Sequence, residues 1–200
     1  MANANSEFPV VAGRLCLDFV NTGMGAERLT SYQRLVDWAR VAGALDPAEA
    51  EFVLERWGTG ADAGEALATA LLLRNQLHLL AKGFAQGEAI APPAAVEIIN
   101  QLLRSRPGYL QLERSGDDWA ARWKVPLRRA DDVLWRVVRS AASLLADDDW
   151  RLVKRCERSA CGLFFYDGTK NHRKRWCRMD VCGGAERAAA YYRRRKGNAV

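Results

Sequence analysis

The chain is short of the features that would place it among common classes of enzyme. Its 200 residues include only two histidines, His78 and His172. The sequence contains no Ser-His-Asp signature, no glycine-rich phosphate-cradling loop and no dinucleotide-binding motif. An enzyme would have to place its chemistry in the amino-terminal region, around Asp18, Arg74 and His78. We therefore expect a protein that is not an enzyme.

Long apolar runs are also missing. No uninterrupted stretch of about 18 apolar residues is present, so we expect no membrane span. The first nine residues have neither the basic start nor the long apolar run of a signal peptide. We therefore expect a cytoplasmic protein whose thiols stay reduced. Apart from one repeated cysteine spacing, the sequence contains no internal repeat and no low-complexity tract.

Cysteine is scarce over most of the chain and concentrated at its end. Four of the five cysteines lie in the last 45 residues, in two pairs with the same C-x4-C spacing: Cys156 with Cys161, and Cys177 with Cys182. Thiolates are strong zinc ligands, and two short loops can each present two of them to one tetrahedral ion. The spacing therefore predicts one zinc ion. The remaining cysteine, Cys16, stands in an apolar run and is expected to be a small buried side chain.

Other uses of the four cysteines are less consistent with the sequence. Disulfides need an oxidising compartment, which we do not expect here. Four cysteines can hold an iron–sulfur cluster, but the usual cluster spacings differ from these. His172 could replace a thiolate, but with four cysteines in place we expect it at the surface. Four thiolates close the coordination sphere, whereas a catalytic zinc keeps an open position, so the predicted zinc is structural.

Charge is distributed unevenly along the chain. The overall net charge is +6, but residues 151–200 contain 14 Lys and Arg against 4 Asp and Glu. Residues 1–150 contain 16 basic and 20 acidic residues. A basic, zinc-bearing tail on a mildly acidic body indicates a polyanionic partner, and nucleic acid is the simplest one. An anionic membrane fits less well, because the basic residues are interleaved with a zinc site rather than with an apolar helix face.

Two basic clusters flank the second cysteine pair, and they are the candidate nucleic-acid-binding residues. Their members are Lys170, Arg173, Lys174, Arg175, Arg193, Arg194, Arg195 and Lys196. Lys and Arg neutralise phosphates, and Arg can also bind guanine in the major groove, so double-stranded DNA is the expected partner. RNA or another protein is the alternative partner. The last cluster could also simply complement a helix dipole and keep the carboxyl terminus soluble.

Hydrophobic periodicity predicts a mostly helical amino-terminal region. Residues 14–22 are compatible with either a helix or a strand. The segment 65–82 is apolar nearly all round, so we expect a central, buried helix there. Capping residues, prolines and glycines predict further helices at about residues 30–42, 46–58, 93–103 and 131–145.

Alternation of apolar and polar residues predicts the strands. Residues 109–125 alternate around a turn at 115–118, which is typical of an antiparallel hairpin with one buried face. Residues 150–155 also alternate, and residues 185–196 favour a helix. We therefore expect an α+β protein. It would consist of a helical domain (1–146) with one hairpin, for sensing or oligomerisation, and a zinc module (150–200) that ends in a helix.

Four polar residues stand on otherwise apolar segments of the amino-terminal region: Asp18, Asn21, Arg74 and His78. Arg74 and His78 are four residues apart and so share one face of a helix. A few polar groups in an apolar pocket are what holds a small ligand, so these residues are candidates for lining an effector site. The sequence favours the simpler interpretation, in which they are buried polar groups that satisfy internal hydrogen bonds.

The motifs along the chain resemble those of the CGNR zinc-finger proteins, bacterial regulators with an amino-terminal domain called ABATE. The family's finger pattern is present as the four cysteines, Phe164, Asp167, Thr169 and the Trp176-Cys177 pair. Residues 17–22 (LDFVNT) resemble the family's opening motif. The resemblance implies zinc binding and a DNA-binding transcription regulator. The chain departs from the pattern where Gly184-Ala185 replaces the signature's Asn-Arg, so any contact made by those two side chains is absent.

Overall fold

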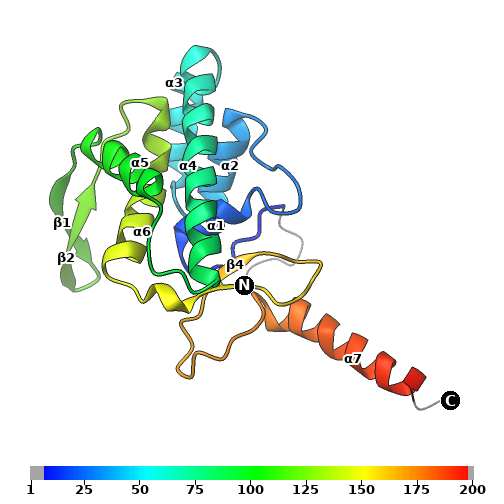
Figure 1. The fold of residues 1–200 in the computed structure, drawn as a ribbon. Helices are drawn as coiled ribbons and strands as arrows, with labels where there is room; N and C mark the ends of the chain where they lie inside the picture. The colour runs from blue at the N-terminus through cyan, green and yellow to red at the C-terminus, as the bar shows by residue number, and fades with distance from the viewer. Residues whose placement is uncertain (1–6, 198–200) are drawn as a thin grey trace.

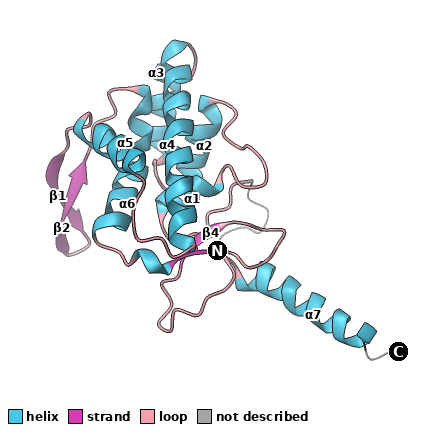
Figure 2. Ribbon diagram, in the orientation of Figure 1, coloured by secondary structure: helices cyan, strands magenta, loops and turns pink. Residues whose placement is uncertain are grey.

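The computed structural model describes residues 7–197, with side chains as far as Tyr191. Figure 1 shows a helical body from which the last helix projects. In the described range, strands form two separate antiparallel pairs, of which Figure 2 shows the longer one at the edge of the body. No helix in this range is both long and apolar enough to cross a membrane. The predicted α+β class is therefore confirmed, with helices dominating.

The helices are α1 (Leu15–Asn21), α2 (Tyr32–Val41), α3 (Pro47–Trp57), α4 (Ala61–Ala85), α5 (Pro93–Arg104), α6 (Trp135–Ala146) and α7 (Gly184–Gly197). The strands are β1 (Tyr109–Ser115), β2 (Asp118–Lys124), β3 (Val153–Arg155) and β4 (Phe164–Tyr166). Two 3-10 turns, η1 (Ala130–Leu134) and η2 (Trp150–Leu152), and one π-helical turn, η3 (Met179–Gly183), complete the described elements.

Helix α4 lies at the centre of the body and contacts α1, α2, α5 and η1. It begins earlier than predicted, because the loop ends at Gly60, whose φ of 95° favours glycine. Gly64 is therefore inside the helix, which at 25 residues tolerates it together with Gly83. The helix is less deeply buried than its composition suggests: Leu72 and Leu79 are about half exposed, so one side faces solvent.

The predicted starts of α2 and α3 are confirmed by their caps, whereas the helix predicted from residue 131 begins at Trp135, after the 3-10 turn η1. The Ser31 hydroxyl accepts a hydrogen bond from the Arg34 amide at the start of α2. Asp46 and Glu49 form a reciprocal capping box on α3, with Pro47 in the first turn. Residues 15–21 form a helix, which resolves the ambiguity of that segment.

The β1–β2 hairpin occurs where the sequence predicts it, but the prediction that one face is buried is wrong. The strands pair with one another from Tyr109 opposite Lys124 to Ser115 opposite Asp118. The apolar side chains Leu110, Leu112 and Trp119 are all more than 60% exposed. The alternation does separate an apolar face from a polar one, but in one copy of the chain the body does not cover the apolar face.

The second strand pair joins the carboxyl-terminal segment to the helical body. The predicted strand 150–155 is shorter than expected, because Trp150–Leu152 forms a 3-10 turn capped by Asp149. Strand β3 contacts α4, and β4 contacts α1. Phe164 and Phe165 on β4 are fully buried in the same hydrophobic core as the helices. The segment that carries the cysteines is therefore packed onto the body.

Candidate metal centre

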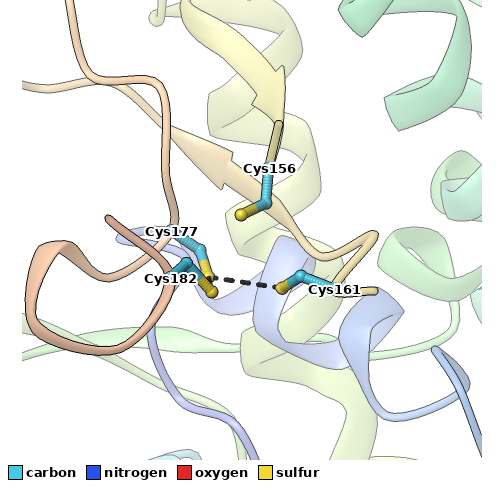
Figure 3. Close-up of side chains that lie close together, drawn as sticks. All are labelled: Cys156, Cys161, Cys177 and Cys182. Carbon is cyan, nitrogen blue, oxygen red and sulfur yellow. Dashed lines mark hydrogen bonds between the residues drawn. The ribbon is translucent and has the colours of Figure 1, made fainter. Parts of the chain in front are cut away.

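The four carboxyl-terminal cysteines converge on one point, although they come from segments up to 26 positions apart. All four sulfurs lie within 4.8 Å of one another (Figure 3). The Sγ–Sγ distance is 3.6 Å between Cys161 and Cys177 and 3.7 Å between Cys177 and Cys182. A zinc–sulfur bond of about 2.3 Å requires sulfurs about 3.8 Å apart at the corners of a tetrahedron. The cluster therefore has the dimensions of a four-thiolate zinc site.

Tight turns present the cysteines in pairs. The Cys156 amide donates to the Leu163 carbonyl, and the Cys161 amide donates to the Arg158 carbonyl, so the chain doubles back between the two thiols. Gly162 follows with a φ of 71°. On the other side, the Cys182 amide donates to the Arg178 carbonyl in the turn η3. The C-x4-C spacing thus corresponds to one turn per pair.

The thiols are arranged for a cation rather than for a disulfide. All five cysteines are free. Burial raises the pKa of the Cys161 thiol to about 11, and burial together with neighbouring thiols also raises the pKa of Cys177. Burial opposes the thiolate of Cys156 as well, but backbone N–H groups outweigh it and lower the pKa of that thiol. Four thiols within 4.8 Å of one another can ionise together only around a positive ion, so the residues fit one structural zinc.

Gly183 shows why a glycine follows the last cysteine. A Cβ at this position would lie 2.7 Å from the Met179 sulfur and 3.2 Å from the Trp176 ring. The indole therefore packs directly on the glycine backbone beside the zinc ligands. Gly184 has open space around it, since a Cβ there would lie 4.0 Å from the Met179 carbonyl oxygen. A larger side chain at residue 184 would fit without a clash.

The buried carboxylate of Asp167 organises the segment that carries the first basic cluster, which we call the basic loop (residues 167–175). Asp167 accepts hydrogen bonds from the Lys154 ammonium at 2.6 Å, the Thr169 hydroxyl at 2.5 Å and the Lys174 amide at 2.9 Å. Lys154 also donates to the His172 carbonyl at 2.6 Å. His172 lies at the surface with a φ of 49°.

These bonds give Asp167 and Lys154 a structural role that periodicity could not reveal. Burial works against the Asp167 carboxylate, but the Lys154 ammonium and the other donors outweigh it and lower its pKa to about 2. The signal in the sequence was an acidic residue in a strongly basic segment, two positions before a threonine. That pattern is typical of a turn held by side-chain-to-backbone hydrogen bonds.

The four residues of the first basic cluster differ in their exposure and in their contacts with other side chains. Lys170 and Arg173 are exposed. The Lys174 ammonium lies 4.9 Å from the centre of the Phe165 ring, and the residue is half-buried. Arg175 pairs with Glu157 at 2.5 Å and lies over the Trp176 ring. The loop therefore offers two free cations and two that also support its packing.

The second basic cluster lies on α7, the helix that projects from the body (Figure 1). The side chains of Arg193, Arg194, Arg195 and Lys196 lie outside the described part of the chain. Arg187, one turn into the same helix, is exposed and was not among the sequence candidates. The zinc ligand Cys182 is two residues from the start of α7, so the metal site fixes where this helix begins.

The four polar residues proposed as pocket liners make internal contacts. The Asp18 carboxylate accepts the amides of Val11 and Ala12 at 2.7 and 2.8 Å. Arg74 donates to Glu27 at 2.8 Å and to Thr22 at 3.1 Å. His78 lies edge-on to the Phe164 ring, 5.5 Å between ring centres, and burial lowers the pKa of its imidazole.

Asn21 makes the most specific contact of this group. Its amide nitrogen donates to the Phe164 carbonyl, and its amide oxygen accepts from the Phe164 amide, both at 2.9 Å. The side chain thus pairs with β4 as a neighbouring strand would, and ties α1 to the zinc-bearing segment. Tyr166 extends this edge by donating its amide to the Ala12 carbonyl at 2.7 Å.

A hollow of about 600 Å³ opens elsewhere, between the amino-terminal segment and the cysteine turns. Phe8, Val11, Met24 and Leu163 contribute apolar walls, and Arg158 also lines it. None of the four proposed pocket liners borders this hollow. The contacts of Asp18, Asn21 and Arg74 agree with the simpler interpretation, that of buried polar groups with internal partners, whereas His78 is only half-buried and contacts the Phe164 ring.

Two family models match the chain, in the order that its motifs predict. The model named ABATE, described as "Putative stress-induced transcription regulator", matches residues 13–148. The model of the CGNR zinc finger matches residues 152–195, which include all four clustered cysteines. Neither description is that of an enzyme class. A search of curated proteins found no match.

Proposed function

We propose that this chain, which belongs to the ABATE family and carries a CGNR zinc finger, is a regulator that binds double-stranded DNA through its carboxyl-terminal basic surface. That surface consists of the basic loop and α7. Zinc has a structural role in this proposal: four thiolates fill its coordination sphere and hold the two parts together. The protein's own basic side chains make the contacts with phosphate.

The observation that carries the proposal is the connection of both basic elements to one metal site. The basic loop runs directly into Cys177, and α7 starts two residues after Cys182. Lys170, Arg173 and Arg187 are exposed on these elements. A projecting helix with a basic end can reach a groove, while a fixed loop can contact the backbone beside it. The net excess of ten basic residues over residues 151–200 supports a polyanionic partner.

The test measures binding of the zinc-loaded protein to a mixed-sequence DNA duplex across a range of salt concentrations. Replacing Arg193, Arg194, Arg195 and Lys196 with Ala should weaken binding and flatten the log–log salt dependence by about 0.9 for each phosphate that is no longer neutralised. The matched control removes four exposed cations from the body, by changing Arg40, Arg56, Lys82 and Arg104 to Ala. The control variant has the same net charge as the first quadruple variant, but its log–log salt dependence should equal that of the wild-type protein.

Two results would contradict this assignment. If both quadruple variants lowered the slope equally, binding would follow net charge rather than the carboxyl-terminal surface. If the wild-type protein bound single-stranded RNA more tightly than duplex DNA at every salt concentration, RNA would replace DNA as the partner.

A further inference from the structure

The β1–β2 hairpin presents an apolar face that the body of the chain does not cover. The strand register places Leu110 opposite Trp123 and Leu112 opposite Ala121, so these side chains share one face with Trp119. Leu112 is 68% exposed and Trp119 is 65% exposed. A two-stranded hairpin is marginally stable alone, and its apolar face normally packs on another element.

The opposite face of the hairpin is polar and already has its partners. Glu113 pairs with Lys124 at 2.6 Å and with Arg122 at 3.3 Å across the strands. The polar face is therefore a solvent-exposed face with its own ion pairs, whereas the apolar face has the composition of a protein–protein interface. Two tryptophans and three leucines, including Leu103 on α5, expose on the order of 500 Å² of apolar surface here.

A groove continues this apolar face onto the body. It has a volume of about 410 Å³ and lies between the hairpin and helices α5 and α6. Leu102, Trp135 and Val138 line its helical side, and Leu110 and Trp123 line its hairpin side. The groove and the apolar face form one surface, which we call the hairpin surface.

Charges at the two ends of the hairpin surface are of opposite sign. The turn at the tip carries the exposed acids Asp117 and Asp118, neither of which forms an ion pair with a described basic side chain. They outnumber the one cation at this end, Arg114, whose guanidinium lies over the Trp119 ring. At the base, the exposed Arg139 of α6 lines the groove and likewise has no acidic partner in the described range. Seven-residue strands separate tip from base by roughly 20 Å.

We propose that the hairpin surface is covered by the hairpin surface of a second copy of this chain, with the tip of each hairpin over the base of the other. A two-fold axis brings each patch against its own counterpart, so a surface that is apolar in the middle and oppositely charged at its ends is complementary to itself. Stable interfaces bury about 800 Å² per partner, and the apolar surface with its charged ends is of this order.

The test is the oligomeric state of the full-length, zinc-loaded chain, measured by sedimentation velocity over roughly 1–100 μM protein. The wild-type chain should be a dimer. Leu112→Glu should raise the dissociation constant by at least about 100-fold, because the symmetry places a buried charge in the interface twice. Gln111→Glu is the matched control: it adds the same charge one residue away, on the polar face, and should leave the dimer intact.

Charge reversal tests the arrangement of the two copies. Asp117→Arg and Arg139→Glu should each weaken the dimer, and the double variant should recover most of the lost affinity. Zinc content and helical circular dichroism verify that each variant is folded. A wild-type chain that is monomeric over the whole range would overturn the proposal, as would equal effects of Leu112→Glu and Gln111→Glu. A double variant weaker than both single ones would refute the tip-to-base arrangement.

Discussion

Asp18 is a buried carboxyl group whose ionisation opposes folding. Burial raises its pKa to about 6, against the weaker opposite effect of the two amides that it accepts. Because the folded protein holds this proton more tightly than the unfolded chain does, stability falls as the pH rises from about 4 to about 6. Above that range the cost is constant.

Asp18→Asn should remove this pH dependence, because the amide oxygen can accept the same two backbone hydrogen bonds without a charge. We expect the variant to match the wild type near pH 4 and to exceed its free energy of unfolding by up to about 3 kcal/mol near pH 7. Urea unfolding of both proteins at the two pH values measures the difference. A difference that does not change with pH would show that Asp18 is not protonated in this range.

Asp167 shows how one residue shapes a whole segment. Asp167→Asn leaves the Lys154 ammonium, which is about one-third exposed, without a charged partner, and it weakens two bonds that fold the basic loop. We expect a loss of about 2 kcal/mol in unfolding free energy. Faster hydrogen exchange at the Thr169 and Lys174 amides would place the effect in the loop. Asp180→Asn, which removes an exposed partner of Arg178, should change neither quantity appreciably.

The elements were predicted well where local chemistry determines them. The capping box at Asp46 and Glu49 and the hairpin turn at residues 115–118 depend on neighbours in sequence, so the pattern is sufficient. The hairpin's burial was predicted wrongly, because alternation shows only that two faces differ, not what covers the apolar one.

The zinc-binding cysteines could be predicted from the sequence, but the hydrogen bonds that hold the neighbouring segments together could not. The repeated spacing of the cysteines is typical of a metal site. The hydrogen-bond partners of Asn21 and Asp18, by contrast, depend on how the folded segments pack. No period in the sequence connects Asn21 with Phe164, which lies 143 residues away.

The zinc-bearing segment and the helical body share one core, so metal loss should affect the entire molecule. Phe164 and Phe165 are buried against the helices, and Asn21 bonds to the same strand. Cys177→Ser should abolish stoichiometric zinc and lower the melting temperature of the helical signal by roughly 10 °C. Cys16→Ala, at a buried cysteine outside the cluster, should keep one zinc per chain. An unchanged melting curve for Cys177→Ser would show that the body folds independently of the metal.

The pairing of Asn21 with β4 also has a mechanical consequence. A zinc finger joined by a flexible linker can adopt many orientations relative to the rest of its chain. Here the zinc-bearing segment cannot rotate against the helical body without breaking the two buried hydrogen bonds between Asn21 and Phe164. The start of α7, two residues after the zinc ligand Cys182, is thus held near the body by the same segment. Any spacing between two such helices would be determined by how the bodies meet, and not by the reach of a linker.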